Sequence, residues 1–164
     1  MSKKILISSC LIGENVRFDG RNKFINHSII EQWQQEECLI AVCPEVAGGL
    51  GVPREPCEII AGTGIQVLQR QARVVSKSGF DHTDNFISGA HFALELAQQH
   101  SIKMAILKKN SPSCGNHQIY DGTFSGTAIA GAGVAAALLQ ENGICVFNET
   151  ELEQAKQYHT QLAE

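Results

Sequence analysis

Lys4–Ser9 reads KILISS and leads directly into Cys10. The run is short, rich in aliphatic side chains and free of the apolar–polar alternation that marks a half-exposed strand. This pattern is typical of a strand buried on both faces, as in the parallel sheets of α/β proteins. Because parallel strands direct their carboxyl ends to one edge of the sheet, Cys10 is expected at the edge where such proteins bind ligands.

The rest of the chain continues this pattern. Three further runs of the same kind predict strands: Leu39–Val42, Met104–Lys108 and Ile144–Phe147. Apolar residues at helical spacing predict four helices. The first carries Ile29, Ile30 and Trp33 and begins at a cap formed by Asn26 or Ser28. The second runs from Thr83 to about Gln99, the third covers Val134–Glu141, and the fourth runs from a Thr150–Glu153 capping box to about Leu162. Alternating strands and helices predict one three-layer α/β domain over residues 1–164, with a mainly parallel sheet.

Several segments between these elements predict loops or an excursion from the sheet. Leu11–Phe24 is polar, Pro44–Cys57 is rich in glycine and proline, and Lys109–Gly133 has the length of a functional loop. Ile65–Leu68 and Ala72–Ser76 are predicted to form a small hairpin.

The composition excludes several classes of function. A chain of 164 residues, of which 43% are hydrophobic, suffices for one core without disulfides. No apolar run reaches the length of a membrane span and no secretory signal is present, so we expect a cytoplasmic protein with no membrane partner. The net charge of −4 disfavours tRNA as a partner, because nucleic-acid binding usually requires a basic face.

Three of the six cysteines follow predicted strands. Cys10, Cys43 and Cys114 come after the first, second and third of them along the chain. In a parallel sheet these three thiols meet at one edge. Thiolates are soft ligands, so three of them in one place favour an iron–sulfur cluster or zinc with one position left open.

The other three cysteines carry weaker expectations. Cys38 and Cys145 lie within or beside apolar runs and are expected to be small buried side chains. Cys57 lies in a predicted loop that could reach the same edge of the sheet. The even count also permits disulfides, which a cytoplasmic chain disfavours.

Polar residues flank two of the three expected ligands. Glu45 follows Cys43 in Cys-Pro-Glu and could act as a general acid or base beside a bound group. Ser111 and Ser113 precede Cys114 in Ser-Pro-Ser-Cys and could bond a ligand sulfur, orient a water or hold a substrate carbonyl. Each also has an ordinary interpretation, as a solvated loop carboxylate and a Ser-Pro turn.

A glycine-rich segment and several basic residues could hold an anion. Residues 48–54 (GGLGVPR) include Gly49 and Arg54, whose backbone amide and guanidinium could contact a phosphate. Arg17 and Lys23 are further sites for an anion contact. The segment matches neither a dinucleotide fingerprint nor a P-loop.

Five motifs cover nearly the whole chain. They are SSCLIGENVRFDGRNK (8–23), CPEVAGGLGVPREPCEI (43–59), GFDHTDNFISGA (79–90), LKKNSPSCG (107–115) and YDGTFSGTAIAGAGV (120–134). In this combination they resemble the short, single-domain thiouracil desulfidase family. The resemblance implies a Rossmann-like α/β fold and an activity on thiolated pyrimidines.

The resemblance also implies a cofactor and site residues. A four-iron, four-sulfur (4Fe-4S) cluster would be held by Cys10, Cys43 and Cys114, and its fourth iron would be free to bind the sulfur of the substrate. Glu45 and Ser111 would be catalytic, with Ser113 as the alternative serine. The implied reaction is a non-redox desulfuration in which water replaces sulfur and hydrosulfide leaves.

The expected substrate is a thiolated uracil as free base, nucleoside or, preferably, monophosphate (thio-UMP). Its phosphate would lie on the glycine-rich segment near Gly49 or beside Arg17, Lys23 or Arg54. Three alternatives remain open at this stage: an iron–sulfur redox sensor, a metal-free cysteine hydrolase with His117 as the base for Cys114, and a structural zinc site.

Overall fold

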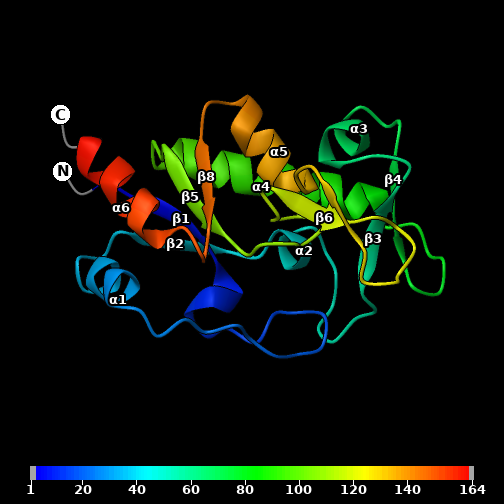
Figure 1. The fold of residues 1–164 in the computed structure, drawn as a ribbon, viewed down its shortest axis with the longest axis horizontal. Coiled ribbons are helices and arrows are strands. Elements are labelled where there is room, and N and C mark those ends of the chain that lie inside the picture. Colours follow the sequence, from blue (N-terminus) through cyan, green and yellow to red (C-terminus); the bar gives the residue numbers. More distant parts are fainter. Residues whose placement is uncertain (1–2, 163–164) are drawn as a thin grey trace.

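The computed structural model describes residues 3–162. Its centre is a four-stranded sheet in which all neighbours are parallel, in the order β2-β1-β5-β8 (Figure 1). The strands are β1 (Ile5–Ser8), β2 (Leu39–Val42), β5 (Met104–Leu107) and β8 (Cys145–Asn148). All four coincide with predicted strands to within one residue at either end, and the parallel sheet is confirmed.

Helices cover both faces of this sheet. The helices α4 (Thr83–Gln99) and α5 (Val134–Glu141) pack on one face, and α1 (Ser28–Gln35) and α6 (Leu152–Gln161) pack on the other. Neighbouring strand residues point to opposite faces, so two separate cores form. The predicted three-layer α/β architecture is therefore confirmed.

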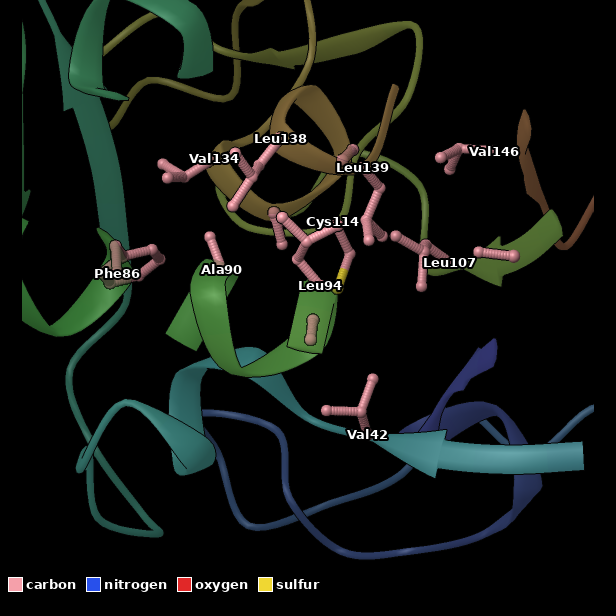
Figure 2. Close-up of a cluster of buried hydrophobic side chains, with 14 of the residues drawn as sticks. Val42, Phe86, Ala90, Leu94, Leu107, Cys114, Val134, Leu138, Leu139 and Val146 are labelled. Carbon is pink, nitrogen blue, oxygen red and sulfur yellow. The ribbon is translucent and has the colours of Figure 1, made fainter. Parts of the chain in front are cut away.

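The larger core lies between the sheet and the α4–α5 pair. Figure 2 shows Leu107 and Val146 of the sheet facing Leu94 of α4 and Leu139 of α5. Cys114 belongs to the same cluster, so this core extends to the edge of the sheet at which β5 ends. Each fully buried leucine or isoleucine contributes about 1.5–3 kcal/mol relative to exposure.

The predicted hairpin is wrong in its first strand. Residues 65–68 belong to the helix α3 (Gly64–Leu68), whose first turn is fixed by Gln66 Oε1, which accepts the backbone N–H of Thr63 at 2.8 Å. The hairpin is instead formed by β3 (Cys57–Ile60) and β4 (Arg73–Ser76), which pair antiparallel. The pattern missed β3 because this strand follows the glycine- and proline-rich segment without a break.

The predicted loops contain short regular elements. The helix α2 (Pro44–Ala47) begins directly after Cys43, and Pro44 takes the first helical position, where its missing N–H costs nothing. A 3₁₀ helix, η1 (Ser9–Ile12), contains Cys10. The strands β6 (Gln118–Tyr120) and β7 (Ala128–Ala130) form an antiparallel pair within the long loop after β5. These turns set the directions of the side chains at the sheet edge.

Two predicted helix caps are wrong. The N-cap of α1 is His27, whose Nδ1 accepts the backbone N–H of Ile29 at 3.1 Å, in place of Asn26 or Ser28. Thr150 donates its hydroxyl to Asn148 Oδ1 at 2.6 Å and does not cap α6, which begins after Glu151. Within residues 3–162 no helix combines the length and apolarity that crossing a membrane requires.

Candidate functional site

A cavity of about 380 Å³ opens at the carboxyl ends of β1, β2 and β5. This volume falls in the range of small-ligand sites. Its walls come from η1, the loop at residues 16–23, α2, residues 54–58, the segment 108–114 and Tyr120. The predicted ligand edge of the parallel sheet is therefore where the structure forms its cavity.

Cys10, Cys43 and Cys114 all line this cavity. Cys10 and Cys43 are placed by tight elements that begin where a strand ends, η1 and the start of α2. Cys114 is placed by a turn at residues 112–114, in the segment that follows β5. Cys10 is 7% exposed and Cys114 is 5% exposed. The structure thus brings together the three thiols that the strand pattern singles out.

The three thiols are close enough to influence one another electrostatically. Burial raises the pKa of Cys10 to about 11, and Cys43 adds to the increase. Burial also raises the pKa of Cys114 to about 12 against the opposing hydrogen bonds from Ser8 and Ser113. Burial likewise raises the pKa of Cys43. Without a positive ion the thiols stay protonated at neutral pH, so a cationic metal centre is what this donor set suits.

Ser8 is a neighbour of the thiols that the sequence pattern did not single out. Its hydroxyl donates to Cys114 Sγ at 3.4 Å and accepts the backbone N–H of Lys108 at 2.9 Å. It therefore ties the end of β1 to the segment after β5 and orients one sulfur. In the sequence, the sign of this role was that a serine ends an otherwise apolar, buried strand.

The remaining cysteines agree with the sequence only in part, because Cys38 is buried as expected whereas Cys145, the first residue of β8, is only partly buried. Cys57 lines the cavity at the start of β3, and burial raises its pKa to about 12. Cys38 is buried in the α1–α6 core, and neither it nor Cys145 lines the cavity. All six are free thiols. Among the described residues no group of three or more histidine, cysteine, aspartate or glutamate side chains is arranged to hold a single metal ion.

Glu45 lies in the cavity with both carboxylate oxygens engaged. Its Oε1 is 3.3 Å from the Arg54 Nε, and its Oε2 accepts the Ser113 hydroxyl at 3.0 Å. The side chains of Glu45 and Arg54 are 15% and 10% exposed. The carboxylate is thus charged, partly desolvated and fixed in direction, as a proton-transfer group requires.

Ser111 and Ser113 form a hydrogen-bonded pair with different roles. Ser113 is 1% exposed and reaches Glu45 directly. Ser111 Oγ lies 3.0 Å from Ser113 Oγ and accepts the backbone N–H groups of Ser113 and Cys114, each at 3.1 Å. Ser113 is therefore the serine in contact with the carboxylate, and Ser111 holds the turn that carries Cys114.

The residues predicted to hold an anion are only partly gathered. Arg17, Lys23 and Arg54 line the cavity, whereas Gly49 does not and lies in the turn after α2, beside Asn85. Each nitrogen of Arg54 makes one contact: Nη1 donates to Gly51 O and Nη2 to Val16 O, both at 3.0 Å, and Nε faces Glu45. The sequence did not show that this arginine partners the carboxylate.

His117 lies away from the cavity. Its Nε2 is 2.9 Å from Glu151 Oε2, and no histidine lines the cavity in the part of the chain that the structure describes. The raised pKa values of the thiols also leave them protonated and weakly nucleophilic without a metal. The geometry therefore does not supply the thiol–imidazole pair of a metal-free hydrolase.

Comparison with known proteins agrees with this arrangement. The model of the 2-thiouracil desulfurase family matches residues 5–151. An uncharacterized protein of Bacillus subtilis (strain 168), YbbK, is 45% identical over 151 residues, which are 90% of this chain and 97% of that protein. A solved structure of the 4Fe-4S-dependent thiouracil desulfidase TudS is 40% identical, with a TM-score of 0.88 over 97% of this chain and 99% of that one. The chain belongs to the 2-thiouracil desulfurase family.

Proposed function

We propose that the protein removes sulfur from a thiolated pyrimidine in an iron–sulfur-dependent, non-redox hydrolysis, with thio-UMP as the preferred substrate. The observation that carries the proposal is the convergence of three unpaired thiols and the Glu45–Ser113 pair on one cavity. Family membership and the likeness to a 4Fe-4S-dependent thiouracil desulfidase support the same chemistry.

Cys10, Cys43 and Cys114 are the residues that hold the cluster in this proposal. Three soft donors on one cavity wall fit an iron–sulfur cluster, which would keep one iron without a protein ligand. When bound, the cluster supplies a Lewis acid for the soft thiocarbonyl sulfur. The protein supplies the groups that bind the pyrimidine and handle protons.

Glu45 is the general base of the proposed reaction. Its carboxylate accepts a proton from the water that attacks the thiocarbonyl carbon of the ring. Arg54 and Ser113 hold the two carboxylate oxygens in place from opposite sides. The water oxygen becomes the carbonyl oxygen, sulfur leaves as hydrosulfide, and no electron is gained or lost. A positioned base of this kind typically contributes about 10²–10⁴-fold to a rate.

Two basic residues of the cavity wall, Arg17 and Lys23, are called the cationic rim here and support a phosphate on the substrate. Arg17 and Lys23 line the cavity, and Lys23 has no carboxylate within ion-pair distance among residues 3–162. Arg17 pairs with Asp19 at 3.5 Å, and its guanidinium lies 5.4 Å from the centre of the Phe18 ring. We assign the phosphate contact to these two residues and a positioning role to Arg54, whose guanidinium is already engaged with Glu45.

Oxygen-18 labelling tests the hydrolytic step. The reconstituted protein is given 2-thiouracil, 4-thiouracil and thio-UMP in oxygen-18 water, and hydrosulfide and the pyrimidine product are quantified together. We expect one hydrosulfide and one labelled oxygen for each product molecule, with no added reductant. A product without the label, or turnover that requires a reductant, contradicts the proposal.

A further inference from the structure

A second carboxylate, Glu58 of β3, lines the same cavity and has no part in the chemistry described above. Its residue is 8% exposed. Both hydrogen bonds to its side chain fall on one oxygen: Oε1 accepts the backbone N–H groups of Gly122 and Phe124 at 3.0 and 3.1 Å. Glu58 is therefore a largely buried residue whose carboxylate is held at one oxygen, Oε1.

The turn that holds Glu58 is itself fixed against β3. Gly122 has a φ of +93°, and a Cβ at this position would lie 2.7 Å from the carbonyl oxygen of Ile59. Only glycine combines this backbone conformation with so close an approach. The two N–H groups are thus presented to Glu58 Oε1 in a defined direction, and the second oxygen, Oε2, is directed by the same contacts.

Glu58 Oε2 is without a partner in the described part of the chain. No salt bridge there involves Glu58. No enclosed side-chain oxygen or nitrogen of the described residues lacks a hydrogen bond, so Oε2 keeps contact with open space, and the cavity is the space that Glu58 lines. An accessible carboxylate oxygen with no partner in the protein is free to accept a hydrogen bond from a ligand in the cavity.

We propose that Glu58 recognises the pyrimidine by accepting the ring N3–H at Oε2. This inference rests on the proposed function, which places a pyrimidine in the cavity. N3–H is the ring donor that a thiouracil base, nucleoside and nucleotide all share. An ionised carboxylate only accepts hydrogen bonds. It therefore favours uracil-type rings, which carry a hydrogen on N3, over cytosine-type rings, whose N3 is itself an acceptor.

The substitution Glu58→Gln separates this role from the structural one. The single amide oxygen of glutamine retains the bonds to Gly122 and Phe124, because it is the only acceptor that the side chain offers them. The amide nitrogen, a donor, then replaces Oε2 at the cavity. The variant keeps the fold of the turn and reverses the hydrogen-bonding character that the ligand meets.

The test is a binding measurement, which does not depend on turnover. Cluster-loaded wild-type protein, Glu58→Gln and the control Glu55→Gln are titrated calorimetrically with uracil, cytosine and 3-methyluracil, each as free base and as monophosphate. Glu55 accepts hydrogen bonds from the backbone N–H and the hydroxyl of Ser78 and lies outside the cavity lining. Its variant removes one nearby negative charge and one of these two acceptors without changing a side chain that lines the cavity. Unfolding midpoints and iron content are measured on the same samples.

We expect the wild type and Glu55→Gln to bind the uracil series about 10- to 100-fold more tightly than the 3-methyluracil and cytosine series. Glu58→Gln loses the preference over 3-methyluracil and gains affinity for cytosine, with an unchanged unfolding midpoint. Equal uracil-to-3-methyluracil ratios in wild type and Glu58→Gln, or no discrimination by the wild type, overturn the inference. A Glu58-dependent preference in a protein that releases no hydrosulfide refutes the proposed activity and leaves the recognition role standing.

Discussion

The two walls of the cavity are built on opposite principles. The thiol wall (Cys10, Cys43 and Cys114) consists of two buried thiols and the partly buried Cys43, and their raised pKa values keep all three protonated. The polar wall (Glu45, Arg54 and Glu58) consists of charged groups that hydrogen bonds and an ion pair already hold in place. In the proposed enzyme the thiol wall would be completed by a metal centre, whereas the polar wall is organised before any ligand arrives.

This difference separates two kinds of defect. Under the proposed function, we expect damage to the thiol wall to remove the cluster and, with it, every later step. We expect damage to the polar wall to leave the cluster bound and to change proton transfer or substrate selection alone. The effects below are ordered from the largest to the smallest.

The largest effect is expected at the thiol wall. Cys114→Ala removes one of the three proposed ligands, so we expect loss of bound iron and a fall in hydrosulfide release of about 10³-fold or more. Iron content and turnover are measured after anaerobic reconstitution. Cys145→Ala, outside the cavity, is the matched control and keeps both. Full iron and activity in Cys114→Ala would remove this residue from the ligand set.

Glu45→Gln tests the polar wall with nearly the same side-chain shape. The amide cannot accept a proton at neutral pH, so we expect wild-type iron content and a kcat lowered about 10²–10⁴-fold. The loss is read as hydrosulfide release per bound cluster. If the variant turns over at the wild-type rate, Glu45 is not the base.

The two serines distinguish contact with the carboxylate from support of the turn. Ser113→Ala removes the hydroxyl that donates to Glu45, and we expect kcat to fall about tenfold with the fold unchanged. Ser111→Ala removes the acceptor of two backbone N–H groups and lowers the free energy of unfolding by about 1–2 kcal/mol. Urea unfolding and steady-state kinetics separate the two, and the reverse pattern contradicts these assignments.

The cationic rim affects the KM for the charged substrate alone. We expect Lys23→Ala to raise the KM for thio-UMP about tenfold and to leave that for 2-thiouracil unchanged, because only the former carries a phosphate. The difference decreases at high salt. An equal change for both substrates would mean that Lys23 supports the cavity without binding the phosphate.

The smallest effect is a pH dependence of the metal-free protein. Burial raises the pKa of Cys57 to about 12 from 9.0, so the folded state retains this proton to higher pH than the unfolded state. The stabilisation is full below pH 9 and is lost as the pH rises towards 12. Cys57 accounts for about 1 kcal/mol of unfolding free energy between pH 9 and pH 10. Urea unfolding with reductant should show a shallower slope in Cys57→Ala, and equal slopes contradict the assignment.

The sequence predicts the thiol wall better than the polar wall. The positions of Cys10, Cys43 and Cys114 follow from strand ends, because parallel strands share an edge whatever the loops do. The buried strands and the amphipathic α4 are likewise readable from local periodicity. These features depend on short-range pattern and on one topological rule.

The polar wall depends on contacts between distant segments. The bond from Ser113 to Glu45 joins residues that are 68 positions apart, and the bond from Gly122 to Glu58 joins residues that are 64 apart. Part of the helix α3 was predicted as a strand because the four-residue segment Ile65–Leu68 is short enough to fit either period, and the capping by Gln66 decides the outcome. Pattern alone does not specify which loop packs on which.

The most direct test of the central claim begins with anaerobic purification and cluster reconstitution. A visible spectrum, an iron assay and a hydrosulfide assay with 2-thiouracil, 4-thiouracil and thio-UMP then follow on the same protein. We predict a brown protein with about four irons per chain that releases hydrosulfide from at least one of the three, fastest from thio-UMP. A colourless protein that takes up no iron contradicts the cluster, and a brown protein inactive on all three contradicts the desulfidase.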